Sequence, residues 1–197
     1  MTDAETLSVY AHKAAEYEAV TGHAVSEDPV LKKFISALPP GSDVLDLGCG
    51  PGLCAAAIAA AGHRVTATDA VPEMVARAKK HAGVTAQLAT FDQIEAEEAY
   101  DGVWANFSLL HAARDAMPRH LVALQKALKS GGLFHIALKS GQGSKRDSLG
   151  RLYTYYTEDE LAALLREAGF TVTDRFSGKD KGLDGSLADW IALHAHA

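Results

Sequence analysis

The sequence is poor in cysteine and in long apolar runs, and both shortages narrow the class of protein. Its 197 residues include two cysteines, Cys49 and Cys54, which are too few for the disulfide framework of a small secreted domain. It shows no secretory signal and no apolar run long enough to span a membrane. We therefore expect a cytoplasmic protein with both thiols reduced and no membrane partner.

Basic residues are scarce relative to acidic ones. Lysine and arginine together number 19 against 25 aspartate and glutamate residues, so the formal net charge is −6. Nucleic acids are usually bound through concentrated positive charge, so this balance argues against a nucleic-acid partner and favours a small molecule. A length of 197 residues suits one domain with a sizeable core, and no feature of the sequence specifies an oligomeric state.

The most informative glycines are three in one loop that follows an apolar run. Residues 44–47 predict a buried strand, which runs into a loop containing Gly48, Gly50 and Gly52, and a helix is expected from Cys54. Glycine removes side chains where a ligand must approach the backbone, and the N-terminus of a helix favours negative charge. The stretch therefore predicts a nucleotide-type binding turn.

The spacing of the glycines and the strand that follows indicate which nucleotide-type ligand the loop binds. A dinucleotide fingerprint needs glycine where Leu53 stands, and a phosphate-binding P-loop needs Gly-Lys-Ser/Thr, so neither motif fits. The next apolar run, 64–69, ends at Asp69, whose carboxylate can accept hydrogen bonds from both hydroxyls of a ribose. Strand, Asp-x-Gly-x-Gly-x-Gly, helix, strand and acidic residue together resemble motif I of the class I S-adenosylmethionine-dependent methyltransferases.

The resemblance covers most of the chain, from about Leu38 to the end. It implies an α/β, Rossmann-like three-layer sandwich with a seven-stranded, mostly parallel sheet and an antiparallel last strand. It also implies S-adenosylmethionine as methyl donor, a small-molecule acceptor and release of S-adenosylhomocysteine. Within it, residues 143–161 resemble small bacterial methyltransferases of the type 11/25 kind, some of them grouped with tellurite-resistance proteins.

Alternating patterns support this fold independently. Strands are expected at 43–47, 64–69, 84–88, 102–105 and 133–138, with helices between them, the last of which stops at Gly131-Gly132. Two final runs, 170–176 and 187–194, are expected to close the sheet around a polar hairpin at 178–185, and 139–151 is expected to be a loop. Residues 1–40 are expected to form N-terminal helices that cap the methyltransferase domain, 41–197, within one structural domain.

Two tyrosines mark the expected cap. Tyr10 and Tyr17 lie seven residues apart, so they share one face of a helix. They can pack on the domain, or they can close over the cofactor, as the corresponding segment does in many small-molecule methyltransferases.

The resemblance implies cofactor contacts in the cap and at the carboxyl ends of the strands. These positions are Tyr10, Tyr17, Asp46, Gly48, Cys49, Gly50, Gly52, Asp69, Ala70, Met74, Phe91, Asp92, Asn106 and Phe107. Asp46 is expected near the amino group of the cofactor, Asp69 at the ribose and Asp92 at the adenine amino group. Asp92 also fits a helix cap or solvated turn, and Cys49 fits a small residue in a crowded loop better than a reactive thiol.

His111 is the candidate general base. Methyl transfer requires alignment, exclusion of water and, for some acceptors, removal of a proton, and an imidazole titrates near neutral pH. The sequence around Asn106 lacks the Asn-Pro-Pro-aromatic signature of methyltransferases that act on nucleobase amines. His194 and His196 have no third ligand at matching spacing, so no metal site is expected.

The basic stretch after 139 is the candidate acceptor site. Arg146 and Arg151, with Tyr153 and Tyr156, can bind an anionic acceptor because guanidinium donates bidentate hydrogen bonds, although a solvated loop has the same composition. Two alternatives to a small-molecule methyltransferase remain open. One is a methyltransferase that acts on a protein or RNA partner, and the other is a non-catalytic regulator that binds S-adenosylmethionine.

Overall fold

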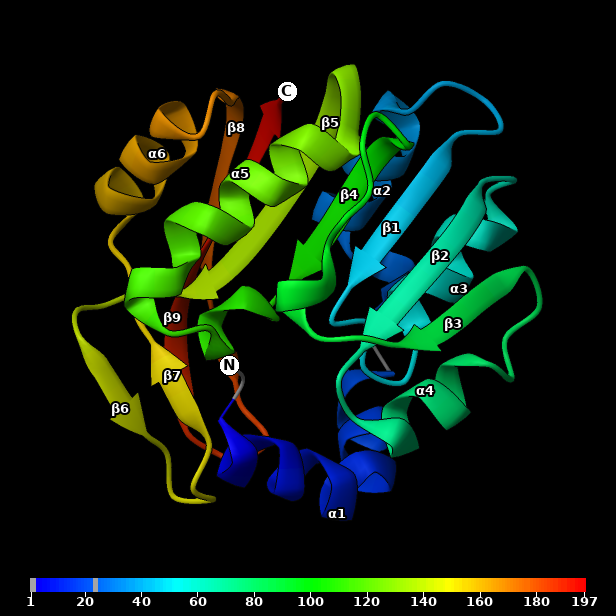
Figure 1. The fold of residues 1–197 in the computed structure, drawn as a ribbon. Helices are drawn as coiled ribbons and strands as arrows, with labels where there is room; N and C mark the ends of the chain where they lie inside the picture. Colours follow the sequence, from blue (N-terminus) through cyan, green and yellow to red (C-terminus); the bar gives the residue numbers. More distant parts are fainter. Residues whose placement is uncertain (1–2, 23–24) are drawn as a thin grey trace.

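A seven-stranded sheet in the order β3-β2-β1-β4-β5-β9-β8 forms the centre of the computed structural model, which describes residues 3–22 and 25–197 (Figure 1). Its strands are β1 Asp43–Leu47, β2 Arg64–Asp69, β3 Val84–Leu88, β4 Tyr100–Asn106, β5 Leu128–Lys139, β8 Thr171–Lys181 and β9 Leu187–His196. A separate hairpin consists of β6 Ser144–Arg146 and β7 Leu152–Thr154. The α-helices are α1 Ala4–Thr21, α2 Pro29–Ala37, α3 Leu53–Ala60, α4 Pro72–Ala78, α5 Met117–Ala127 and α6 Glu158–Glu167, and the short 3-10 turns are η1 Val25–Glu27, η2 Phe91–Gln93, η3 Leu109–His111 and η4 Arg114–Ala116.

The direction of the strands places the site. β1 to β5 pair in parallel, so their carboxyl ends meet at one edge of the sheet, where ligands bind in folds of this kind. β9 runs antiparallel to β5, and β8 pairs antiparallel with β9. The predicted Rossmann-like, seven-stranded sheet with an antiparallel last strand is therefore confirmed.

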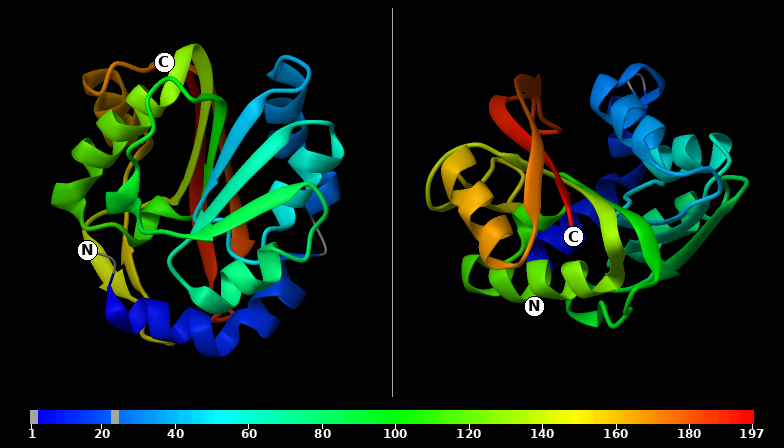
Figure 2. Two further views of the ribbon diagram at one scale, coloured as in Figure 1. Left: turned by 45° about the vertical axis from the view of Figure 1, so that its right-hand side comes forward. Right: turned by 90° about the horizontal axis from the view of Figure 1, so that it is seen from above.

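Helices cover both faces of the sheet (Figure 2). On one face, α5 and α6 bury a core that includes Leu121, Phe134 and Leu165. On the other, α2 and α3 bury a second core in which the rings of Phe34 and Trp104 lie 5.0 Å apart. The apolar stripe of α2 thus packs on the sheet, whereas α1 alone crosses below the carboxyl ends of the strands (Figure 1).

α1 begins at a well-formed cap and is tied to the body of the protein at several points. The Asp3 carboxylate caps it by accepting the Thr6 N–H at 2.9 Å. Backbone angles at Lys13 depart from helical values and kink the helix. The alcohol of Thr6 in turn accepts the backbone N–H of Leu152 at 2.9 Å, so the first turn of α1 is joined to β7.

Three expected boundaries are wrong. The stretch 139–151 contains strand β6, although its residues have the polar composition of a loop, and β6 pairs with β7, which follows this stretch. The polar hairpin is shorter than expected because β8 continues to Lys181. Gly178 therefore lies within β8, where a larger residue would not fit, since a Cβ would come within 2.5 Å of the Trp190 ring. α5 ends at Ala127, before Gly131, because Leu128 already pairs with Tyr100 in the sheet.

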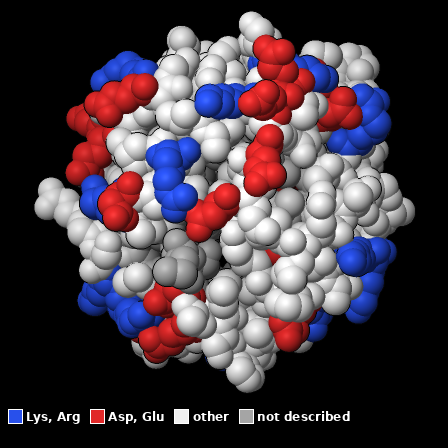
Figure 3. Space-filling model, viewed as in Figure 1, with Lys and Arg blue, Asp and Glu red and all other residues white. Residues whose placement is uncertain are grey.

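Acidic and basic side chains are interspersed on the face seen in Figure 3. Among residues 3–22 and 25–197, no helix is long and apolar enough to cross a membrane. The same part of the chain holds no group of three or more histidine, cysteine, aspartate or glutamate side chains that could bind a metal ion.

Candidate active site

The glycine loop after β1 has a shape that only glycine accommodates. Gly48, Gly50 and Gly52 have φ angles of +70°, +54° and +84°, in the left-handed region that L-residues avoid. A Cβ on Gly48 would lie 2.4 Å from the Cβ of Ser108, and one on Gly52 would lie 2.7 Å from the Cβ of Ala78. The loop therefore packs closely against the segments that contain Ser108 and Ala78, and its glycines place no side chain at the carboxyl edge of the sheet.

Asp69 ends β2 and turns back onto this loop. Its carboxylate accepts the N–H of Gly50 at 2.8 Å and the N–H of Val71 at 2.9 Å. Burial raises the pKa of Asp69. With Ala70, Met74 and Phe91, Asp69 lines a cavity of about 70 Å³, which we call the Asp69 cavity.

Asp46 lies in the middle of the buried sheet, opposite Trp104 in the register of β4. It is 3% exposed, and its Oδ2 has no hydrogen-bond partner among the described residues. Burial, reinforced by the negative charge of Asp69, raises the pKa of Asp46 to about 7. It lines, with Asn106 and the glycine loop, a second cavity of about 590 Å³, the Asp46 cavity.

This arrangement fits S-adenosylmethionine. A buried carboxylate oxygen without a donor is costly, and a ligand that brings its own ammonium group removes that cost. A glycine cradle and an acidic strand end beside an apolar wall suit the remaining parts of a nucleoside ligand. The sites around Asp46 and Asp69 supply all three features.

Phe107 stands where the cavities meet. It follows β4, and its φ of +53° is unusual for a residue with a side chain. Its N–H donates to the carbonyl oxygen of Ala137 at 3.0 Å, which holds the turn. Phe107 and Tyr17 both line the Asp69 cavity, the Asp46 cavity and a third cavity, so their rings separate the three spaces.

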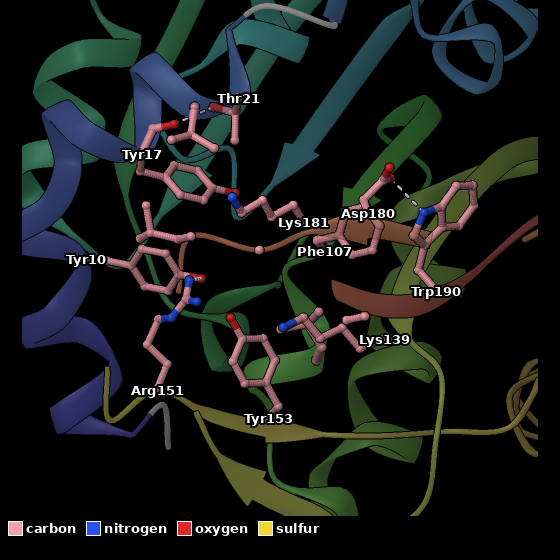
Figure 4. A pocket seen from close by; sticks show the side chains of 15 residues that line it. Tyr10, Tyr17, Thr21, Phe107, Lys139, Arg151, Tyr153, Asp180, Lys181 and Trp190 are labelled. Atoms are coloured by element: carbon pink, nitrogen blue, oxygen red, sulfur yellow. Dashed lines mark hydrogen bonds between the residues drawn. The ribbon is translucent and has the colours of Figure 1, made fainter. Parts of the chain in front are cut away.

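The third cavity, of about 190 Å³, lies between α1, the β6–β7 hairpin and the β8–β9 turn (Figure 4). We call it the Lys139 cavity. Its walls combine rings with charged groups, namely Tyr10, Tyr17, Phe107, Tyr153 and Trp190 with Lys139, Arg151, Asp180 and Lys181. The amine of Lys139 and the guanidinium of Arg151 both point toward this space in Figure 4.

A chain of hydrogen bonds joins α1 to the floor of the site. Asp147 accepts from Arg151 Nε at 2.9 Å and from Arg151 Nη2 at 2.6 Å, and Arg151 Nη1 donates to the Tyr10 hydroxyl at 3.0 Å. The Tyr10 hydroxyl lies 2.9 Å from His111 Nε2, and His111 Nδ1 lies 2.7 Å from the carbonyl oxygen of Leu152. Since a carbonyl only accepts, His111 carries its proton on Nδ1 and accepts from Tyr10 at Nε2.

His111 is thus fully engaged in this conformation. Burial lowers the pKa of His111 to about 4, which keeps the ring neutral at physiological pH. It lines the Asp69 cavity rather than the Lys139 cavity. The geometry favours a positioning role that holds Tyr10, and with it α1, over the site.

Several expected site residues lie elsewhere. Arg146 forms an ion pair with Asp3 at 2.8 Å and lines none of the three cavities. Tyr156 is buried beneath Arg114, whose guanidinium lies 4.4 Å from the ring centroid. Asp92 pairs with Arg119 at 2.6 Å.

The remaining expected residues fall at or beside the site. Arg151 and Tyr153 line the Lys139 cavity, as the basic stretch predicts. Cys49 lines the Asp46 cavity, and burial raises the pKa of its thiol, so it has no reactive character.

Among the residues that line the Lys139 cavity and were not predicted from the sequence are Lys139, Lys181 and Trp190. Lys139 directly follows the apolar run of β5, so the rule that singled out Asp69 at the end of β2 also applies to it. Trp190 and Lys181 come from the β8–β9 hairpin, whose strands are longer than the sequence pattern indicates.

Comparison with known proteins agrees with this site. A family model described as "Methyltransferase domain" matches residues 44–132, which include the glycine loop, Asp69 and Phe107. The ubiquinone biosynthesis O-methyltransferase of Xanthomonas axonopodis pv. citri is 30% identical over 75% of this chain and 71% of its own. An S-adenosyl-L-methionine-dependent Diels-Alderase of Talaromyces variabilis is 32% identical, but over 50% of this chain and 36% of its own length.

A solved structure extends the similarity to the whole fold. The 1,6-didemethyltoxoflavin-N1-methyltransferase of Burkholderia thailandensis, with its substrate and S-adenosylhomocysteine bound, superposes with a TM-score of 0.71 and 26% identity, over 96% of this chain and 87% of its own. Fold and site together define a nucleoside-binding transferase of the Rossmann-like class. The chain belongs to the class I S-adenosylmethionine-dependent methyltransferases, and S-adenosylmethionine is its methyl donor.

Proposed function

We propose that this methyltransferase methylates a small molecule bound in the Lys139 cavity, beside a cofactor held by Asp46, Asp69 and the glycine loop. The observation that carries the proposal is the meeting of the cavities at Phe107 and Tyr17 beneath α1. A cavity of about 190 Å³ suits a small acceptor better than a protein or RNA chain.

The residues around Asp46 and Asp69 bind and orient the cofactor. Asp69, positioned by two backbone N–H groups, offers its remaining lone pairs to ribose hydroxyls, while Asp46 offers Oδ2 to an ammonium group. Ala70 and Met74 supply an apolar wall for a purine ring. When bound, S-adenosylmethionine supplies an electrophilic methyl group on a sulfonium centre, which needs no acid catalyst.

The acceptor side aligns its ligand and excludes water. The rings of Tyr10 and Tyr17 lie 5.4 Å apart, edge to face, and close the space from the side of α1. His111 holds the Tyr10 hydroxyl through Nε2 and keeps its own proton on Nδ1, so it acts as a positioning residue. Catalysis then rests mainly on alignment within a dry site.

We also propose that α1 serves as a lid and the remainder of the chain as the methyltransferase domain. The ion pair between Arg146 and Asp3 is partly exposed, and exposed pairs contribute little to stability. The hydrogen bonds of Tyr10 with His111 and Arg151 must then break for α1 to open for exchange of cofactor and acceptor.

The names of two similar proteins indicate oxygen or nitrogen as the acceptor atom. They are named as an O-methyltransferase of ubiquinone biosynthesis and an N1-methyltransferase of 1,6-didemethyltoxoflavin, so proteins similar to this chain methylate oxygen and nitrogen.

The two free thiols, Cys49 and Cys54, are consistent with the cytoplasmic location that we propose.

Calorimetric titration tests the cofactor assignment. S-adenosylmethionine and S-adenosylhomocysteine should bind the unaltered protein, with NAD as a negative control. Asp69→Ala should weaken both by about 100-fold, because it removes charge-assisted hydrogen bonds worth roughly 1.5–3 kcal/mol each. The matched variant Asp189→Asn, at an exposed carboxylate outside the three cavities, should bind as the unaltered protein does. Binding of NAD, or full affinity in Asp69→Ala, would refute the assignment.

A further inference from the structure

Lys139 occupies a position that the cofactor site does not use. It ends β5 at the carboxyl edge, directly across from Trp190 in the register of β9. Its Nζ lies 3.9 Å from the centroid of the Tyr153 ring. It is partly buried, and it forms no ion pair or hydrogen bond with any residue of 3–22 or 25–197. A half-buried ammonium group without a counter-ion calls for a ligand that supplies one.

The charged groups that face Lys139 do not supply that counter-ion. The guanidinium of Arg151 repels it and is itself neutralised by both donor contacts to Asp147. Asp184, in the β8–β9 turn, and Asp147 attract it, but neither carboxylate forms an ion pair with Lys139: Asp184 binds the N–H and hydroxyl of Ser186, and Asp147 is paired with Arg151. Burial, followed by Arg151, lowers the pKa of Lys139. An anion bound in the cavity would reverse this shift.

The walls beside Lys139 are aromatic and fixed in place. The Trp190 Nε1–H donates to Asp180 at 2.7 Å, and the indole covers Gly178, where a Cβ would clash. The ring of Phe107 meets the Trp190 ring edge to face at 6.2 Å. Together with Tyr153 these rings form apolar walls that suit a planar ligand.

We propose that the acceptor is an aromatic or heteroaromatic compound bearing an ionised oxygen, and that Lys139 Nζ binds this oxygen. The proposal rests on the proposed function, because it places the ligand in the acceptor cavity. Lys139 thereby selects the anionic form of the acceptor and sets its orientation between Tyr153 and Trp190. An uncharged ring of the same shape leaves the ammonium unpaired and binds more weakly.

The test uses the full chain saturated with S-adenosylhomocysteine and the probe 4-nitrophenol, whose anion absorbs visible light. Its methyl ether, 4-nitroanisole, is the uncharged control, larger by one methyl group, and 4-nitrobenzoate distinguishes a carboxylate from a phenolate preference. The phenolate should bind at least about tenfold more tightly than the phenol, so the pKa of bound 4-nitrophenol falls by about one unit. Absorbance titrations at several pH values measure this shift.

Variants assign the effect to Lys139. Lys139→Met should weaken phenolate binding about tenfold or more, in line with the roughly 1.5–3 kcal/mol of a charged hydrogen bond, and should abolish the pKa shift. Binding of 4-nitroanisole should not change, whereas a merely structural role would weaken both probes. Lys139→Arg should restore anion binding, and thermal unfolding checks that each variant is folded. The control Lys145→Met, at an exposed lysine of β6 outside the three cavities, should match the unaltered protein.

The outcomes separate this inference from the proposed function. Absence of anion-selective binding in the unaltered protein, or its persistence in Lys139→Met, would overturn the inference while S-adenosylhomocysteine still binds. Failure of the unaltered protein to bind S-adenosylhomocysteine in calorimetry would instead overturn the cofactor assignment. Anion selectivity that depends on Lys139, in a protein that binds S-adenosylhomocysteine, would support both.

Discussion

The cofactor side and the acceptor side of the site are held together by different kinds of interaction. On the cofactor side, the N–H groups of Gly48 and Cys49 both donate to the carbonyl of Thr68, and backbone groups also fix Asp69. On the acceptor side, side chains meet across long stretches of sequence, as when Tyr10 contacts both His111 and Arg151. One side is therefore built from neighbouring strands and their loops, and the other from segments that only the complete fold brings together.

The sharpest way to break the cofactor side is to add one methyl group to its loop. Gly48→Ala combines a left-handed φ of +70° with a contact of 2.4 Å, so it should cost about 3 kcal/mol or more. S-adenosylhomocysteine should bind about 100-fold more weakly, since the loop must shift. Thermal unfolding and calorimetry measure the two effects.

A matched glycine on the acceptor side provides the comparison. Gly143 has nearly the same φ, +71°, but open space where a Cβ would lie. Gly143→Ala should therefore cost only the backbone strain, about 1–2 kcal/mol, and leave binding of S-adenosylhomocysteine unchanged. Equal losses in the two variants would show that the crowding around Gly48 has no part in binding.

An intermediate effect is expected where the two sides are joined. Tyr10→Phe removes the hydroxyl between Arg151 and His111 and leaves two buried polar groups unsatisfied, at a cost of about 1–3 kcal/mol. Amide hydrogens of α1 should exchange faster, and those of β1 should not. Tyr100→Phe is the control, because the Tyr100 hydroxyl makes no hydrogen bond with the described residues. Unchanged exchange in α1 would refute its fastening through Tyr10.

The smallest effect concerns pH. The folded pKa of His111, about 4, lies below the ordinary value of 6.5, so the unfolded chain binds the proton more readily. Its contribution to the free energy of unfolding is therefore complete above pH 6.5 and is lost as the pH falls toward 4. At a pH near 5.5 the loss should be about 1.4 kcal/mol.

Denaturant unfolding as a function of pH measures this contribution. His111→Asn should make the fall in stability between pH 6.5 and pH 4 smaller but not remove it, because burial also lowers the pKa values of His135 and His194. His12→Asn, at an exposed histidine of α1, should leave it as it is in the unaltered protein. A fall of unchanged size in His111→Asn would contradict a contribution from His111.

The same contrast explains what the sequence could predict. β1, β2 and β3 have the predicted bounds, because buried residues and a glycine loop mark them locally. The β6–β7 hairpin was missed because β6 is exposed along its length and has the composition of a loop. Its placement involves contacts with α1, such as the hydrogen bond from the Leu152 N–H to the Thr6 hydroxyl.

The site divides in the same way. The positions of Asp46, Asp69 and the glycine loop follow from one motif, whereas the Lys139 cavity needs a strand register that sequence does not specify. Only the pairing of β5 with β9 brings Trp190 across from Lys139. Of the two arginines, which look alike in sequence, Arg151 is buried at the cavity and Arg146 is paired on the outside.

The position of β9 has a consequence for how the protein assembles during synthesis. β9 follows the other strands in the sequence, yet it lies between β5 and β8, so β8 has no partner in the sheet until β9 has been made. During synthesis the parallel strands β1 to β5 can therefore pair early, whereas β8 and β9, which border the acceptor site, pair late. Until β9 is in place, the exposed edge of β5 is a surface where nascent chains can aggregate.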